Sequence, residues 1–142
     1  KGKVIGVDLN PIAPLEGVTT IVGDFTDPLV QERIRKEADG VVNVVVSDAS
    51  PKLSGQKSYD QGRAIGLGEE ALAFACTILK PGGNMVIKSF QGELFGELIA
   101  EVRKHFHSVR GYRTKATRRG SAETYIIAKN FKGTCDGAEG PL

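Results

Sequence analysis

Three charged residues, each beside an apolar segment, could together transfer a proton or position a hydroxyl group. Asp48 is the first charge after Val41–Ser47, a β-branched run typical of a strand buried on both faces of a parallel sheet. Lys88 interrupts the apolar segment 84–90, although lysine is rarely buried. Glu123 begins the last apolar segment. Because ligands of open α/β sheets bind beyond the carboxyl ends of the strands, we expect these three residues around one crevice.

Each of these residues also has a purely structural interpretation. An aspartate directly after a strand often forms a turn, and Ser-Asp-Ala-Ser-Pro around Asp48 is rich in turn-forming residues. Lys88 could extend its aliphatic stem so that its ammonium reaches solvent. Glu123 could be an ordinary surface carboxylate at the start of a strand. The residue types alone leave these alternatives open.

Two further carboxylates follow the first two predicted strands. Asp8 ends a strand predicted over 3–8, and Asp24 follows one predicted over 19–22. In a nucleotide-binding sheet an acidic residue at the end of the second strand commonly accepts hydrogen bonds from ribose hydroxyls, and Asp24, at the same edge, could reach an adenine amino group. Alternatively, both aspartates could have a purely structural role. Asp8 could cap a turn toward Asn10, and Asp24 could belong to the start of the following helix.

The elements that must position these residues alternate between strands and helices. In chain order we predict strands over 3–8 and 19–22, a helix over 27–38, a strand over 41–47, a loop over 49–59, a helix over 61–79, a strand over 84–90, a helix over 94–106, and strands over 109–114 and 123–129. Such alternation predicts an α/β fold whose mainly parallel sheet is covered on both faces. No helix separates the last two strands, so we expect them to pair antiparallel.

Composition limits the class of protein. The 142 residues suit one domain over about 1–130 followed by a flexible, glycine-rich tail over 131–142, and the net charge of +2 names no partner. No apolar run approaches the roughly 20 residues that span a bilayer. Cys76 and Cys135 fit neither a disulfide framework nor a zinc-binding spacing, and His105 and His107 resemble surface residues at a helix end. We therefore expect a cytoplasmic monomer without a metal site.

Basic residues concentrate in the last third of the chain. A charge run is usually a solvated face, but this one extends over a helix end, a strand and a loop, as a surface for a phosphate backbone would. The candidate residues for binding such a nucleic acid are Lys52, Arg113, Lys115, Arg118 and Arg119.

Several of these segments together resemble one known family. They are Gly6-Val7-Asp8-Leu9, Gly23-Asp24-Phe25, Ser-Asp-Ala-Ser-Pro-Lys-Leu-Ser-Gly around Asp48, Leu-Lys-Pro-Gly-Gly-Asn-Met-Val-Ile-Lys-Ser-Phe-Gln-Gly-Glu around Lys88, and Ser-Ala-Glu-Thr-Tyr-Ile-Ile-Ala around Glu123. In this order, over about Lys3–Lys129, the chain resembles the FtsJ-like (heat-shock) RNA ribose 2′-O-methyltransferases. The resemblance implies a Rossmann-like S-adenosylmethionine methyltransferase fold with a closing antiparallel strand pair.

The resemblance also implies roles for individual residues. The family has a Lys-Asp-Lys-Glu tetrad, of which Asp48, Lys88 and Glu123 match the last three members. The S-adenosylmethionine site falls on Asp8, Leu9, Asp24, Phe25 and Asp48. Lys88 would accept the proton of the ribose 2′-hydroxyl or orient that group, and acting as a base requires a neutral amine. Asp48 and Glu123 would favour its charged form, so they more plausibly orient the lysine and the substrate.

The chain departs from the family pattern at its beginning. The first lysine of the tetrad and the glycine-rich methionine-binding loop precede the second strand in this family, and neither occurs here. The family's first strand would lie between the strands predicted over 3–7 and 41–47. We therefore expect both strands to present unpaired edges, and we expect the sequence to be a fragment of a longer protein.

The implied activity is methylation of a ribose 2′-hydroxyl in RNA, most simply a uridine of large-subunit ribosomal RNA. Alternatives are a transfer RNA 2′-O-methyltransferase, another S-adenosylmethionine-dependent methyltransferase on the same scaffold, and a catalytically inactive RNA-binding domain. A nucleotide-dependent oxidoreductase is a weaker alternative, because the order Asp48, Lys88, Glu123 argues against it.

Overall fold

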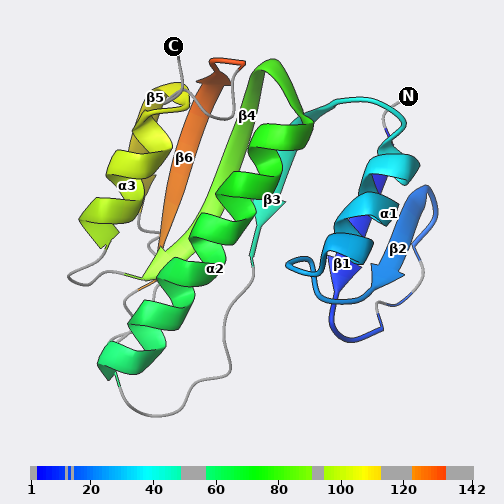
Figure 1. The fold of residues 1–142 in the computed structure, drawn as a ribbon, viewed down its shortest axis with the longest axis horizontal. Coiled ribbons are helices and arrows are strands. Elements are labelled where there is room, and N and C mark those ends of the chain that lie inside the picture. The colour runs from blue at the N-terminus through cyan, green and yellow to red at the C-terminus, as the bar shows by residue number, and fades with distance from the viewer. Residues whose placement is uncertain are drawn as a thin grey trace. The chain divides into compact units, whose positions relative to one another are not determined.

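A computed structural model describes residues 3–11, 13, 15–48, 57–90, 95–112 and 123–133, apart from the side chains at 57–61, 64, 90 and 123. The chain forms two compact units, Lys1–Val42 and Asn43–Leu142 (Figure 1). The elements are β1 (Val4–Asp8), β2 (Val18–Val22), α1 (Pro28–Ala38), β3 (Val42–Ser47), α2 (Lys57–Ile78), β4 (Leu79–Phe90), α3 (Phe95–Arg103), β5 (Phe106–Tyr112) and β6 (Glu123–Phe131). Their order is the predicted one.

The first unit pairs β1 and β2 in parallel, as expected, with Val4 opposite Val18 and Asp8 opposite Val22. Helix α1 then begins where the sequence predicts. The Asp27 side chain accepts a hydrogen bond from the amide of Leu29, and proline occupies the first helical turn. The helix ends at a residue in the left-handed conformation, Asp39, with φ 52°.

The second unit contains a four-stranded sheet in the order β3-β4-β6-β5. Strand β6 runs antiparallel to both neighbours, which confirms the predicted closing pair. Two contacts give the direction of β3 relative to β4. A Cβ placed on Gly83 of β4 would lie 2.8 Å from the carbonyl of Asn43 on β3. Five residues further along both strands, Lys88 contacts Asp48. This constant offset means that β3 and β4 run parallel.

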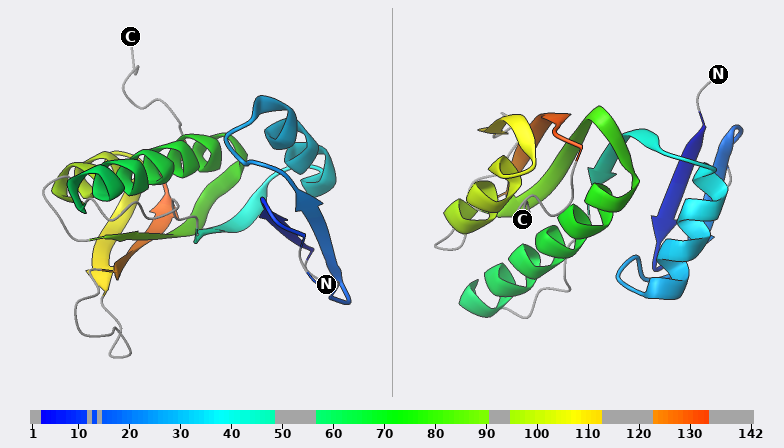
Figure 2. Two further views of the ribbon diagram at one scale, coloured as in Figure 1. Left: turned by 90° about the horizontal axis from the view of Figure 1, so that it is seen from below. Right: turned by 45° about the horizontal axis from the view of Figure 1, so that its top comes forward.

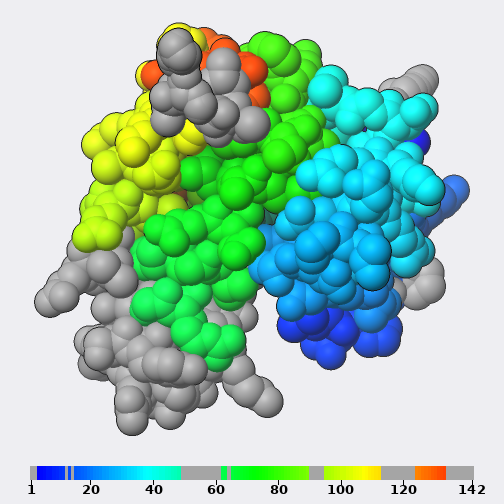
Figure 3. Space-filling model, viewed as in Figure 1, coloured from blue at the N-terminus to red at the C-terminus, as the bar shows by residue number. Residues whose placement is uncertain are grey.

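Helices α2 and α3 both cover one face of this sheet (Figure 2). Their side chains close over the strands in the space-filling view (Figure 3). A Cβ at Gly68 would lie 2.9 Å from Leu98 Cδ2 and 3.6 Å from Ile87 Cγ2, so this glycine allows α2 to approach both α3 and the sheet closely. The most buried core residues include Met85, Ile87, Leu98, Val102 and Ile126. We expected helices on both faces, but the described helices of this unit lie on one.

Strands β1 and β3 each have a single neighbour in the described sheets, β2 and β4 respectively. This is the pattern of unpaired edges that the sequence predicts. The expectation that Val41–Ser47 is buried on both faces is wrong, because Val44 and Val46 are exposed. A β-branched run indicates a strand but cannot show whether both of its faces are covered.

The main errors in the predicted boundaries lie at helix ends. Helix α2 begins at Lys57, within the predicted loop. The prediction started the helix too late because the polar first turn has no apolar residues at helical spacing. Phe106, predicted on the apolar face of α3, instead begins β5 and pairs with Phe131, with ring centroids 5.4 Å apart. The amide of His105 bonds the carbonyl of Val102, and this tight turn ends the helix although the apolar spacing continues. Strand β4 likewise begins at Leu79, directly after α2, earlier than predicted.

Candidate active site

Lys88 and Asp48 form an ion pair at the carboxyl ends of two parallel strands. Lys88 Nζ lies 2.9 Å from Asp48 Oδ1. Asp48 directly follows β3, and Lys88 lies two residues before the end of β4. Register explains the contact, because parallel strands with this offset bring their ends to the same edge of the sheet. The structure thus brings together two of the three predicted catalytic residues.

The two members of this pair differ strongly in exposure. The Lys88 side chain is 16% exposed, whereas that of Asp48 is 73% exposed. An ammonium is rarely this buried without a partner, and the carboxylate compensates its charge. Asp48 keeps a large accessible surface for a ligand. A hydroxyl group beside the pair could accept a hydrogen bond from the ammonium and donate one to the carboxylate.

The backbone of Glu123 lies near the ion pair. It pairs with Phe90 at the end of β4, and Tyr125, two residues later on β6, pairs with Lys88. The Glu123 backbone is therefore at the same edge of the sheet as the ion pair, while its side chain lies outside the described residues. The candidate RNA-binding residues Lys52, Arg113, Lys115, Arg118 and Arg119 also lie outside the described residues.

In the first unit, Asp8 and Asp24 lie at the ends of neighbouring strands. The amide of Gly23 donates to the carbonyl of Asp8 at 2.8 Å, which joins the end of β2 to the end of β1. The Asp8 carboxylate accepts from the amide of Asn10 at 3.1 Å, so the predicted capping of a turn toward Asn10 is present. The paired strands therefore place two carboxylates at one edge, where they could accept hydrogen bonds from a ribose and an adenine.

Asp24 is held by Thr26. Its Oδ1 accepts from the Thr26 hydroxyl at 2.7 Å and from the Thr26 amide at 2.9 Å. Both hydrogen bonds lower the pKa of the Asp24 carboxyl, and the bond from the hydroxyl has the larger effect. Burial opposes them by raising this pKa. Asp24 is therefore fixed as an anion while forming the turn that leads into α1. The structural interpretation of Asp24 is therefore confirmed, and it leaves the exposed carboxylate accessible to a ligand.

The remaining predicted cofactor residues flank these aspartates. Leu9, directly after Asp8, is exposed, and an exposed leucine beside a carboxylate offers an apolar contact to a ligand. Phe25 is half-buried, and its carbonyl accepts a hydrogen bond from the side-chain amide of Gln31 on α1. The helix thus fixes the backbone between Asp24 and Thr26.

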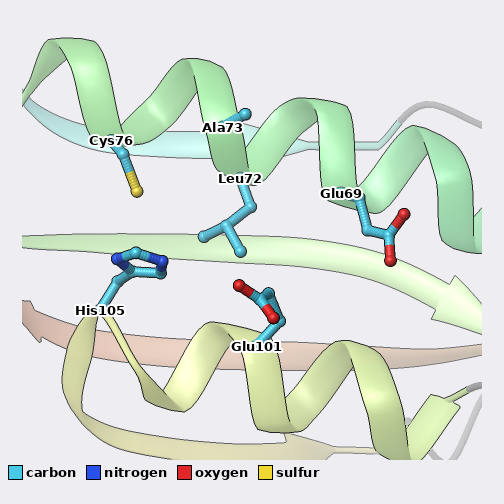
Figure 4. A pocket seen from close by; sticks show the side chains of 6 residues that line it. All are labelled: Glu69, Leu72, Ala73, Cys76, Glu101 and His105. Carbon is cyan, nitrogen blue, oxygen red and sulfur yellow. The ribbon is translucent and has the colours of Figure 1, made fainter. Parts of the chain in front are cut away.

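A separate hollow lies on the helix-covered side of the second unit (Figure 4). It measures about 300 Å³ and is lined by Glu69, Leu72, Ala73, Cys76, Glu101 and His105. Alternation along β4 places Lys88 on the opposite face from Ile87, which packs toward α2, so this hollow is distinct from the ion pair. His105, expected at the surface, is 8% exposed because the chain turns inward where α3 ends. Among the residues that the structure describes, no group of three or more His, Cys, Asp or Glu could hold a metal ion.

Sequence reasoning missed two tyrosines. Tyr125 pairs directly with Lys88, and Tyr112 pairs with Tyr125 on the next strand. Strand alternation could have placed Tyr125 on one face with Glu123, but it could not supply the register with Lys88.

The described strands and helices have the Rossmann-like fold of known methyltransferase structures. The fold matches a crystal structure from Plasmodium falciparum, described as a ribosomal RNA methyltransferase, with a TM-score of 0.83, 24% identity, and coverage of 94% of this chain and 74% of that one. It also matches human methyltransferase-like protein 13 in complex with SAH, with a TM-score of 0.62, 13% identity, and coverage of 99% and 64%.

More specifically, the chain belongs to the FtsJ-like methyltransferase family, whose family model matches residues 1–131. It is 91% identical over 141 residues to the ribosomal RNA large subunit methyltransferase E of Methanoculleus marisnigri, covering 99% of this chain and 70% of that protein. It is 62% identical over 142 residues to the protein of the same name from Methanosphaerula palustris, covering 100% and 70%. Within the described residues, no helix is long and apolar enough to cross a membrane.

Proposed function

We propose that this chain methylates a ribose 2′-hydroxyl in RNA with S-adenosylmethionine, and that a uridine of large-subunit ribosomal RNA is the target. The observation that carries this proposal is the Lys88–Asp48 ion pair of 2.9 Å at the strand ends, within a chain of this family. The names of the relatives support ribosomal RNA over transfer RNA.

The residues of the first unit suit the cofactor. S-adenosylmethionine supplies an electrophilic methyl group on a sulfonium when it is bound. Asp8 and Asp24 offer acceptors for its ribose hydroxyls and its adenine amino group, since both carboxylates follow paired parallel strands. The exposed Leu9 and the half-buried Phe25 offer apolar contacts beside them. The Thr26 hydrogen bonds keep Asp24 ionised and oriented before any ligand arrives.

The residues of the second unit suit the ribose hydroxyl. In the reaction a bond forms between the 2′-oxygen and the methyl carbon, the carbon–sulfur bond breaks with its electron pair staying on sulfur, and the hydroxyl proton passes to solvent water by way of the exposed Asp48 carboxylate. Most of the catalysis is alignment of the two reactants. Lys88 would donate to the 2′-oxygen and Asp48 would accept from the hydroxyl. The ion pair favours this orienting role, because a carboxylate beside the ammonium opposes the neutral amine that a general base requires.

Binding and turnover together test this proposal. Calorimetry on the chain should detect S-adenosylmethionine binding, and transfer of labelled methyl should be followed on ribosomal RNA and transfer RNA. Lys88→Ala should lower methyl transfer at least about 100-fold while RNA binding remains. Lys80→Ala, which removes an exposed lysine from the same strand, should leave turnover unchanged.

Each alternative predicts a different result. RNA binding without cofactor binding or turnover would favour the catalytically inactive RNA-binding domain. Methylation of transfer RNA in preference to ribosomal RNA would favour the transfer RNA enzyme. Cofactor binding without methylation of either RNA would favour a different methyltransferase on this scaffold.

A further inference from the structure

The hollow between α2 and α3 contains a thiol and an imidazole that the proposed reaction does not use. Four of its lining residues lie on α2, one lies on α3, and His105 lies at the turn that follows α3. Two of the α2 residues, Glu69 and Ala73, are exposed, so the hollow opens between the outer surfaces of the two helices. Its lining therefore involves neither the strand edges nor the sheet face opposite these helices.

Cys76 and His105 point toward one another in this hollow (Figure 4). Each is 8% exposed, and they come from different elements, Cys76 from the last turn of α2 and His105 from the turn before β5. Backbone hydrogen bonds hold His105 in place, because its amide donates to the Val102 carbonyl at 3.0 Å and its carbonyl accepts from the Lys132 amide at 2.8 Å. The packing of α2 against this fixed turn therefore sets the thiol beside the ring.

A thiol beside an imidazole has a specific reactivity. The thiolate is the nucleophilic form of cysteine, and an adjacent imidazole forms it by accepting the thiol proton. An isolated thiol is only a few per cent thiolate at pH 7, so transfer of the proton to His105 raises the reactive fraction of Cys76 about 10-fold or more. The resulting thiolate and imidazolium neutralise each other, which makes the charged pair compatible with burial.

Two carboxylates select the charge of the molecules that reach the thiol. Glu69 on α2 and Glu101 on α3 line the same hollow (Figure 4). Glu101 lies 3.2 Å from Lys104 Nζ, but both side chains of this pair are largely exposed, so the pair is weak. One lysine against two carboxylates leaves a negative charge that repels anions. The volume of about 300 Å³ has room for a small molecule.

We propose that Cys76 and His105 form an oxidation site at which small, uncharged peroxides convert the thiol to a sulfenic acid. His105 accepts the thiol proton, and the thiolate sulfur then attacks one oxygen of the peroxide. A sulfur–oxygen bond forms, the oxygen–oxygen bond breaks, and the leaving hydroxide takes the proton from the imidazolium to give water. The sulfur is oxidised by two electrons, and the peroxide is reduced by the same two.

Trapping of the sulfenic acid tests this proposal. In the Cys135→Ser chain Cys76 is the only thiol. Hydrogen peroxide at pH 7 followed by dimedone labels the sulfenic acid, and mass spectrometry measures the rate of labelling. Cys76 should react about 10-fold faster or more in the folded chain than in the same chain unfolded in urea, where no imidazole is held beside the thiol. A chain that also carries Cys76→Ser should give no adduct.

The contribution of the imidazole is measured by comparing two histidines. His105→Gln keeps a hydrogen-bonding side chain and should slow the oxidation of Cys76 about 10-fold. The matched control is His107→Gln, because His107 is an exposed ring two residues further along the chain, and its removal should leave the rate unchanged. The urea midpoint of each variant shows whether it is folded, and His105→Asn serves as the second variant should the glutamine variant unfold.

Two alkylating reagents of similar size test the selection by charge without any change to the pair. Iodoacetamide is neutral, whereas iodoacetate is an anion. The folded chain should prefer the neutral reagent about 5-fold more strongly than the unfolded chain does. Glu69→Gln and Glu101→Gln should each reduce this preference. Glu70→Gln, which removes an exposed carboxylate outside the lining of the hollow, should change it little.

Three results would overturn the inference. One is oxidation of Cys76 no faster in the folded chain than in the unfolded chain, which would make it an inert buried thiol. Another is an unchanged rate in a folded His105→Gln chain, which would remove the imidazole from the reaction. The third is the same reagent preference in the folded and unfolded chains, which would mean that the thiol reacts only after local unfolding. None of these results bears on methyl transfer, so the proposed function is tested separately.

Discussion

The amide of Gly23 donates a 2.8 Å hydrogen bond to the carbonyl of Asp8, so the two strand ends that carry the candidate cofactor-binding carboxylates are joined through backbone atoms. Gly23 also lies against α1, where a Cβ on this glycine would be 2.8 Å from Val30 Cγ2. A side chain at this position therefore requires movement of the Val30 side chain, of the helix or of the turn.

Gly23→Ala should consequently destabilise the chain and displace Asp24. Overpacking against Val30 should cost about 1–3 kcal/mol of unfolding free energy, and S-adenosylmethionine affinity should fall as well. Chemical denaturation and calorimetry measure the two effects. The double variant Gly23→Ala, Val30→Ala should recover part of both losses, because it removes the clashing methyl group.

A second glycine provides the control. An added Cβ at Gly66, inside α2, would meet nothing within 4 Å. Gly66→Ala should therefore stabilise the chain by about 0.5–1 kcal/mol through helix propensity. If both substitutions lowered stability equally, the explanation through Val30 would be wrong.

The Thr26 hydroxyl should control the titration of Asp24. It is the main cause of the lowered pKa, so Thr26→Ala should move the pKa of Asp24 up toward its ordinary value of 3.8. A carboxyl whose pKa is lowered in the folded state adds stability that is present above its unfolded pKa and is lost as pH falls through the folded pKa. The substitution should thus lower the unfolding free energy near neutral pH and make this free energy depend less on pH below about pH 4.

NMR titration of the Asp24 side chain measures this shift directly. Thr26→Ser keeps the hydroxyl and should preserve the lowered pKa. A pKa that does not change in Thr26→Ala would mean that the backbone amide alone accounts for the shift.

Much of the fold could be predicted because its signals are local. Asp27 and Pro28 mark the start of α1, and the short connection before β6 requires an antiparallel pair. The contact between Lys88 and Asp48 followed from strand order, since parallel strands end at one edge. What could not be predicted depends on tertiary context. The apolar spacing through Phe106 continues a helical period that the turn at His105 interrupts, and the exposure of Val44 depends on which elements neighbour β3.

A buried hydroxyl in the second sheet should be dispensable for stability. Ser89 is fully buried, and its Oγ has no hydrogen-bond partner among the described residues. Burial of an unsatisfied polar atom costs about 1–3 kcal/mol, while serine and alanine differ little in volume. Ser89→Ala should therefore leave the unfolding free energy unchanged or raise it by about 1 kcal/mol, as measured in urea. Ser108→Ala, at an exposed position on β5, should change it by less than about 0.5 kcal/mol.

Substitution of Asp48 should separate the structural from the functional role of its ion pair. Asp48 is 73% exposed but Lys88 only 16%, so Asp48→Asn, which leaves the mostly buried ammonium without that carboxylate, should lower the unfolding free energy by about 1–3 kcal/mol, between the values for exposed and buried pairs. Methyl transfer should fall about 100-fold or more, because the neutral amide cannot take up the hydroxyl proton and attracts the ammonium less than a carboxylate does. Glu32→Gln is the matched control, since it removes an exposed carboxylate from the Arg35 pair on α1. A large loss of stability with normal turnover would instead make the Lys88–Asp48 pair a structural contact and remove the main support for the proposed site.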